Sequence, residues 1–294
     1  MKGSDDLEEM WSIKIYTGNS PLQLKPKKND TTPSITRHDV TDISASFVAD
    51  PFMIPVDNIW HLFMEILNTK TGNGEIGLVT SVDGVIWDYQ QVVLKENYHL
   101  SYPFVFKNKG TYYMVPETLD ANAIRLYKAM NFPNEWEFQT NLVTGQYADP
   151  TLFQHNNHWW IFASDKKHKS STLTLFYANN LEGPYVEHPK NPIIEKNQRI
   201  ARPAGRIIEF DHRIIRLCQD CYPKYGSAVR AFEITELSPE NYNEHELPES
   251  PILKQSKKEK QWNSRGMHHL DAHKTRDNQW IASVDGCYSN TVNL

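Results

Sequence analysis

The sequence predicts an all-β fold, a five-bladed β-propeller formed by a single domain over residues 1–294. Three observations favour it. One opening motif recurs five times at intervals of roughly 50 residues, which is typical of a repeat architecture. Each copy leads into apolar runs joined by short turns, the pattern of β-hairpins. Aromatic residues, which favour sheets, make up 12% of the chain.

The opening motif contains a small or polar residue, a second polar residue and usually a proline, followed by an apolar run. Its copies begin near residues 49, 101, 148, 201 and 268. The first and third copies read Ala-Asp-Pro, the second Ser-Tyr-Pro and the fourth Ala-Arg-Pro, whereas the fifth, His-His-Leu-Asp, lacks the proline. Each copy is expected to start the inner strand of one blade.

The remaining strands follow each motif in order. Second strands are predicted over residues 59–64, 111–115, 158–162, 213–217 and 279–284. Third strands are predicted over residues 75–80, 124–129, 173–178 and 229–234, with short fourth strands such as 91–94. The fifth unit runs out of chain, so residues 11–16 are expected to supply its missing strand and close the ring, which leaves only short, protected edges. A pair of β-sandwiches would also contain many short strands, but it does not predict one motif at five near-even spacings.

The charge balance excludes several classes of partner. The net charge of -5, from 31 Lys and Arg against 36 Asp and Glu, leaves no basic stripe for nucleic acid. No apolar run approaches the ~20 residues of a membrane helix, and the acidic start does not resemble a signal peptide. We therefore expect a cytoplasmic protein without membrane insertion. Its three cysteines cannot all pair within one chain, and Cys218 and Cys221 are expected to be reduced.

The start of the first strand and the end of the second lie on the same rim of a propeller. This places the carboxylates of Asp50, Glu117 and Asp149 around one mouth. Paired carboxylates in a concave site are what cleavage of a glycosidic bond needs, one as acid and one as base or nucleophile. These three are the candidate catalytic residues. An aspartate before proline can also simply cap a turn, and that alternative stays open for Asp50 and Asp149.

A second set of rim residues is expected to bind the substrate. It comprises Tyr102, Arg202, Arg206, Asp220 and His269. The two arginines flank Pro-Ala-Gly and are suited to bidentate binding of carboxylate, phosphate or sugar hydroxyls. The alternative for Arg202 is a salt bridge to Asp149 or Glu117.

A catalytic metal is not expected. His269, Asp271 and His273 share one strand face, but Cys218-x-x-Cys221 has no second half of a zinc site. We predict no cofactor, with a structural ion or a water on the channel axis near His269 as the one alternative.

The combined motifs resemble a known family. The residues that carry this resemblance are 47–52, 74–78, 100–106, 202–206 and 268–271. They are similar to the propeller at the N-terminus of plant glucosamine inositolphosphorylceramide transferases and, more broadly, to the propellers of glycoside hydrolase families 43 and 32. Bacterial relatives of that domain stand alone or are fused to sugar-modifying enzymes, so the resemblance implies such an enzyme as a partner.

The resemblance also implies residue roles. Asp50 matches the catalytic base of the hydrolases and Asp149 the aspartate that orients and tunes their acid. Their general acid is a glutamate that opens the fourth blade, where this sequence has Arg202. Arginine does not release a proton at neutral pH, so Glu117 becomes the expected acid.

The leading hypothesis is a glycoside-hydrolase-like protein that cleaves a glycan, and the arginines favour an acidic one. Two alternatives stay open. One is a non-catalytic glycan-binding module, and the other is a sugar transferase, either of them in polysaccharide or glycolipid biosynthesis.

Overall fold

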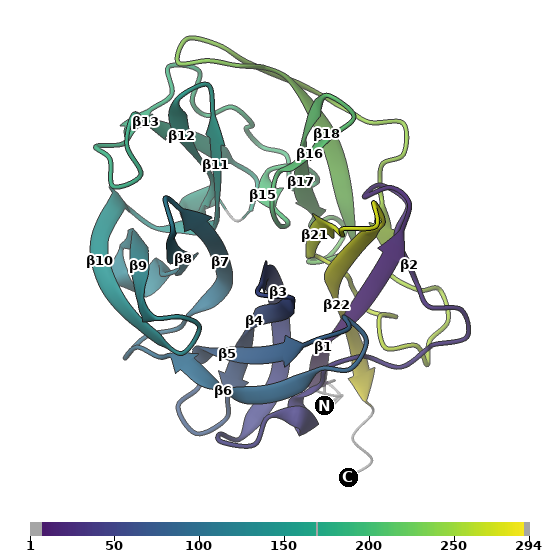
Figure 1. The fold of residues 1–294 in the computed structure, drawn as a ribbon. Coiled ribbons are helices and arrows are strands. Elements are labelled where there is room, and N and C mark those ends of the chain that lie inside the picture. Colours follow the sequence, from purple (N-terminus) through teal and green to yellow (C-terminus); the bar gives the residue numbers. More distant parts are fainter. Residues whose placement is uncertain (1–7, 169, 291–294) are drawn as a thin grey trace, which may run out of the picture.

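The computed structural model describes residues 8–168 and 170–290. Five antiparallel sheets surround one axis, and their inner strands β3, β7, β11, β15 and β21 lie closest to it (Figure 1). The predicted five-bladed β-propeller is confirmed. Three short 3-10 helices, η1 (Arg37–Asp39), η2 (Leu119–Ala121) and η3 (Lys166–His168), lie in connections. Within the described residues, no helix is long and apolar enough to cross a membrane.

The first three blades each contain four strands in chain order. The first blade consists of β3 (Ala45–Val56), β4 (Ile59–Asn68), β5 (Gly74–Ser81) and β6 (Asp88–Leu94). The second consists of β7 (Ser101–Asn108), β8 (Thr111–Glu117), β9 (Ala123–Asn131) and β10 (Glu135–Thr144). The third consists of β11 (Tyr147–His155), β12 (His158–Asp165), β13 (Leu173–Ala178) and β14 (Val186–Glu187).

The fourth blade has an interrupted inner strand. Its elements are β15 (Arg202–Pro203), β16 (Ile208–Phe210), β17 (Arg213–Asp220), β18 (Ala228–Leu237), β19 (Tyr242–Glu246) and β20 (Leu253–Lys254). Both β15 and β16 pair with β17, and Gly205 lies between them with a φ of +131°. A Cβ atom at Gly205 would lie 1.9 Å from the carbonyl oxygen of Leu270 in the fifth blade. Only glycine fits this close approach of two blades.

The fifth blade joins the two ends of the chain. Its strand order is β2 (Lys25–Pro26), β1 (Glu8–Gly18), β22 (Trp280–Asn290) and β21 (Leu270–Lys274). Strand β1 pairs antiparallel with β22 from Glu8 opposite Asn290 to Gly18 opposite Trp280. The prediction that the N-terminal strand closes the ring is therefore confirmed, and it supplies the third strand of this blade.

The apolar core lies between neighbouring blades. One cluster of buried side chains packs β3 against β7 and β11 through Phe52, Phe104 and Leu152. A second joins the third and fourth blades through Trp160 and Ile207. Because each sheet buries both faces against its neighbours, the blades hold fixed positions around the axis, and so do the polar residues where the inner strands begin.

Candidate functional site

Three blades open on the same unusual backbone conformation. Asp50, Tyr102 and Asp149 each precede a proline and have left-handed φ angles of 50°, 48° and 52°. Each lies at a register shift between the inner and second strands of its blade. A left-handed φ costs a non-glycine residue about 1–2 kcal/mol, and a bulge redirects a side chain out of the regular strand alternation. The repeated motif therefore encodes a bulge, and structures keep such strain mainly at functional sites.

Carboxylates of the preceding blades hold two of these bulges. The Oε2 atom of Glu117, at the end of β8, accepts the backbone N–H of Asp149 at 3.0 Å. The Oδ2 atom of Asp285, on β22, accepts the backbone N–H of Asp50 at 3.4 Å. All four residues are buried. These contacts bring Glu117 to Asp149 and Asp285 to Asp50, and each links two neighbouring blades. The catalytic roles of Asp50, Glu117 and Asp149 stay predictions.

The carboxylate of Asp149 is fully engaged. The Nε and Nη2 atoms of Arg202 donate to its two oxygens at 2.5 and 3.2 Å, and Gln219 Nε2 donates to Oδ2 at 2.7 Å. Arg202 Nη2 also lies 3.6 Å from Glu117 Oε2. Of the two interpretations open for Arg202, the salt bridge to Asp149 is the contact present, and it is bidentate. Two acids thus share one guanidinium.

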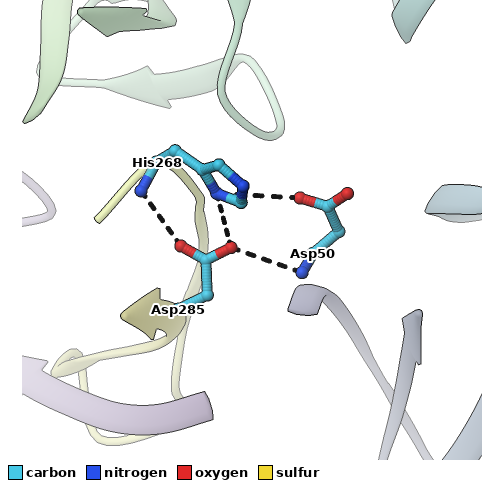
Figure 2. Close-up of side chains that lie close together, drawn as sticks. All are labelled: Asp50, His268 and Asp285. Carbon is cyan, nitrogen blue, oxygen red and sulfur yellow. Dashed lines mark hydrogen bonds and ion pairs between the residues drawn. The ribbon is translucent and has the colours of Figure 1, made fainter. Parts of the chain in front are cut away.

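Asp50 faces a histidine that a second aspartate orients (Figure 2). The Nδ1 atom of His268 lies 2.6 Å from Asp285 Oδ2 and 3.9 Å from Asp50 Oδ1. The Oδ1 atom of Asp285 accepts the backbone N–H groups of His268 and His269, each at 3.0 Å. Asp285 therefore fixes the turn that carries both histidines, and it fixes the ring of His268 beside Asp50.

Burial and crowded charge raise the pKa of two acids. Burial first, and then the carboxylates of Asp149, Glu65 and Asp285, raise the pKa of Asp50 well above its usual range. Burial and the charge of Asp149 raise the pKa of Glu117 to about 8, although Arg202 opposes the shift. Glu117 therefore holds a proton at neutral pH, the state that the predicted acid role requires. The shared causes are burial, which is the larger, and the negative charge of Asp149.

His269 is buried without a hydrogen-bond partner for either ring nitrogen among the described residues. Its ring packs on Phe52 and Tyr102, its Nδ1 lies 3.8 Å from Asp50 Oδ1, and burial lowers its pKa to about 4. A neutral imidazole with unsatisfied nitrogens is suited to hold a water or an ion.

A metal ion would find a compact ligand set beside His269. Potential ligand atoms of Asp50, His268 and Asp285 lie within 4.8 Å of one another. However, both oxygens of Asp285 already accept hydrogen bonds from backbone N–H groups. The donor set fits a cation only in part. The absence of a catalytic metal and the ion or water near His269 both stay predictions.

The other predicted binding residues make internal contacts. The hydroxyl of Tyr102 lies 2.7 Å from Thr151 Oγ1 and accepts the backbone N–H of Gly205 at 2.7 Å, which bridges three blades. Arg206 donates to Asp271 Oδ1 at 2.9 Å. Asp220 lies 3.2 Å from Arg199 Nη1 and 2.8 Å from Arg230 Nη2. Their substrate-binding roles stay predictions, and each role would require a ligand to compete with these contacts.

Tyr225, in the connection between β17 and β18, was missed by the sequence analysis. Its ring lies 5.2 Å from the guanidinium carbon of Arg202 and meets the ring of His268 edge-on at 5.0 Å, yet its side chain is 42% exposed. A Cβ atom at Gly226, where φ is +67°, would come within 3.0 Å of Trp11. The sequence Tyr225-Gly226, in which the glycine lets the loop pack close to Trp11, is the feature that could have indicated this residue. An exposed aromatic ring beside polar groups is a typical platform for a sugar ring.

This five-bladed propeller, with acids, two histidines and an exposed tyrosine at its site, resembles the propellers of glycoside hydrolases in its fold. Solved structures show the same fold at low identity. β-1,2-mannobiose phosphorylase from Listeria innocua matches with a TM-score of 0.66 and 14% identity, over 92% of this chain and 96% of that one. The family 117 glycoside hydrolase Zg3597 from Zobellia galactanivorans matches with a TM-score of 0.54 and 14% identity, over 96% and 92%.

The chain belongs to the family described as glucosamine inositolphosphorylceramide transferase 1, N-terminal, whose model matches residues 3–287. Glucosamine inositolphosphorylceramide transferase 1 from Oryza sativa subsp. japonica is 35% identical over 302 residues, which cover 96% of this chain and 40% of the relative. The Arabidopsis thaliana protein of the same name is 34% identical over 303 residues, covering 96% and 39%. The chain thus spans about two fifths of these relatives.

Proposed function

We propose that this domain is a carbohydrate-recognition module of glycolipid or glycan assembly, and that the mouth at Asp50 binds an amino sugar. The observation that carries the proposal is the bidentate pair of Arg202 and Asp149, bonded at 2.5 and 3.2 Å. In the hydrolases that the sequence resembles, an acid stands where Arg202 stands. This departure supports binding over the hydrolysis that the sequence analysis favoured.

Charge supports an amino sugar. The two arginines that favoured an acidic glycan are paired with Asp149 and Asp271. Burial first, and then neighbouring carboxylates, raise the pKa values of Asp50 and Glu117, and a ligand ammonium group would offset the charge of those carboxylates. Tyr225 would stack on the sugar ring. The names of the relatives join glucosamine to an inositolphosphoryl lipid in a transferase reaction, which supports glucosamine as the first ligand to test.

Calorimetric titration with glucosamine, with glucose as the neutral comparator, tests the proposal. Wild type is expected to bind glucosamine more tightly than glucose. Asp50→Asn, which keeps a residue that tolerates a left-handed φ, is expected to lose about tenfold in glucosamine affinity, the effect of one charge-assisted hydrogen bond.

Tyr225→Ala is expected to weaken the binding of both sugars. Tyr222→Ala is the matched control, because Tyr222 lies in the same loop with 53% exposure but stacks on Arg199 instead of Arg202. Equal affinity of wild type for glucosamine and glucose, or no effect of either Asp50→Asn or Tyr225→Ala, would contradict the proposal.

A second candidate function is catalysis of sugar cleavage or transfer. The observation that favours it is the pKa of about 8 at Glu117, which keeps a protonated acid within the site. Product analysis of the bound sugars, with and without an activated sugar donor, separates the candidates. A product formed by wild type and lost in Glu117→Gln at unchanged affinity would make the domain an enzyme.

A further inference from the structure

A cavity of about 270 Å³ lies between the second and third blades, away from the mouth at Asp50. Asn108, the last residue of β7, and Gln154, near the end of β11, line it. Tyr102 and Asp149 lie near the starts of the same two strands, six and five residues earlier. A strand rises about 3.3 Å per residue, so the cavity lies roughly 17–20 Å from the bulges at the mouth.

Two aromatic rings that line this cavity are held in place by a third. Tyr113 of β8 and Trp159 of β12 are the lining rings. Both pack on Phe106, which is buried, with ring centroids 5.8 and 5.6 Å from it. Phe106 belongs to the core cluster of the second and third blades, so the two rings keep their positions without a ligand. A preformed aromatic surface lowers the entropic cost of binding.

Four carboxamide side chains supply most of the polar groups of the cavity, namely those of Asn108, Gln154, Asn179 and Asn180. The last two lie in the connection between β13 and β14, which the buried Leu181 anchors in the same core cluster. Within residues 8–168 and 170–290, none of the four side chains makes a hydrogen bond. A carboxamide both donates and accepts hydrogen bonds, as a sugar hydroxyl does, so the two groups match.

The charges of the lining cancel. Lys109 is its one basic residue and Glu182 its one acidic residue in the part of the chain that the structure describes, and both are exposed. An ion of either sign would meet one side chain that repels it, whereas a neutral ligand with many hydroxyls would meet none. Aromatic rings beside uncharged hydrogen-bonding groups suit the apolar face and the hydroxyls of a neutral sugar.

We propose that this cavity binds a neutral hexose unit of a glycan. The rings of Tyr113 and Trp159 would contact the apolar face of the sugar, and the amides of Gln154 and Asn179 would bond to its hydroxyls. The proposal rests on the lining of this cavity alone and does not require the amino-sugar mouth. Because the two sites lie at opposite ends of β7 and β11, one domain would hold two separate glycan units.

Fluorine NMR of protein labelled with fluorotryptophan tests the proposal, because Trp159 lines this cavity. The Trp159 resonance is assigned by its absence in Trp159→Phe. Titration with methyl glucoside, methyl galactoside and methyl mannoside is expected to shift this resonance saturably for at least one of them. Gln154→Ala combined with Asn179→Ala is expected to lower that affinity about tenfold, since two hydrogen bonds to hydroxyls are lost. Both residues are exposed, so the variant is expected to keep its fold.

Asn241→Ala is the matched control, because Asn241 is an exposed amide in the turn between β18 and β19 that does not line the cavity. This control should leave the affinity unchanged, and so should Tyr225→Ala, which is directed at the mouth.

Three outcomes would overturn the site: no saturable shift with any of the three hexosides, an unchanged affinity in the Gln154 and Asn179 variant, or a loss in Tyr225→Ala. Tighter binding of glucosamine than of each hexoside, measured at Trp159, would overturn the assignment to a neutral sugar. Because the label reports on this cavity, these results stand apart from the outcome of the glucosamine titrations at the mouth.

Discussion

Asp285 on β22 of the fifth blade accepts the backbone N–H of Asp50 on β3 of the first blade at 3.4 Å. Strand β22, which carries Asp285, is held along its length by β1. Ring closure by the N-terminal strand therefore also positions the acid that faces His268. Glu117 makes the equivalent contact to Asp149 between the second and third blades. Asp285 and Glu117 thus accept hydrogen bonds from the two bulges, whereas Asp50 and Asp149 lie on those bulges.

Replacement of Asp285 should destabilise this junction. Asp285→Ala leaves the buried backbone N–H groups of His268 and His269 without their acceptor, and each unsatisfied group costs about 1–3 kcal/mol. We expect Asp285→Ala to lower the free energy of unfolding by several kcal/mol in urea titrations. Asp285→Asn keeps an acceptor oxygen and should lose less. Equal losses in both variants would show that the charge, and not the acceptor, holds the turn.

Replacement of Arg202 should destabilise the protein, because Arg202 neutralises the buried carboxylate of Asp149. Arg202→Met leaves Asp149, which is 1% exposed, with Gln219 as its one remaining side-chain donor among the described residues. Breaking a buried ion pair from one side costs about 3–5 kcal/mol. Urea unfolding should show this loss, and Arg202→Met combined with Asp149→Asn should recover part of it. A stable single variant would instead indicate that Arg202 is available to a ligand.

The raised pKa of Glu117 predicts a pH dependence of stability. The carboxyl titrates near 4.5 in the unfolded chain and at about 8 in the folded protein. Between these values the folded protein holds a proton that the unfolded chain releases, so the free energy of unfolding falls as the pH rises. The contribution is complete below pH 4.5 and lost above about 8.

Glu117→Gln should flatten this dependence, because the amide keeps an oxygen for the Asp149 N–H but does not titrate in this range. The measurement is urea unfolding of both proteins from about pH 5 to about pH 9. A wild-type curve that runs parallel to the variant over this range would contradict a protonated Glu117 at neutral pH.

The fold could be predicted from the sequence because the strained bulge requires a short local motif that ends in proline. In the first three copies of the motif the residue before the proline has a left-handed φ, so Asp50, Tyr102 and Asp149 mark equivalent positions. The missing strand of the fifth unit then left residues 11–16 as the only partner in the predicted layout, and this segment lies within β1.

The pairing of the site residues could not be predicted in the same way. Arg202 and Asp149 lie 53 residues apart, and either ligand binding or a salt bridge satisfies a guanidinium. Only the geometry of neighbouring blades decides between them. Tyr225 was missed because it lies outside the repeated opening motif, and its position depends on how Gly226 packs against Trp11.

A substitution at Gly205 tests whether the close approach of the fourth and fifth blades stabilises the protein. Gly205→Ala places a Cβ atom 1.9 Å from the Leu270 carbonyl oxygen at a φ of +131°, and the displaced backbone N–H would lose its bond to the Tyr102 hydroxyl. Gly110→Ala is the matched control, because its φ is +88° but nothing lies within 4 Å of the added atom. The control should lose only the backbone strain of about 1–2 kcal/mol, whereas Gly205→Ala should lose clearly more in urea unfolding. Similar losses in the two variants would mean that the close approach of Gly205 to Leu270 and the hydrogen bond from Gly205 to Tyr102 contribute little to stability.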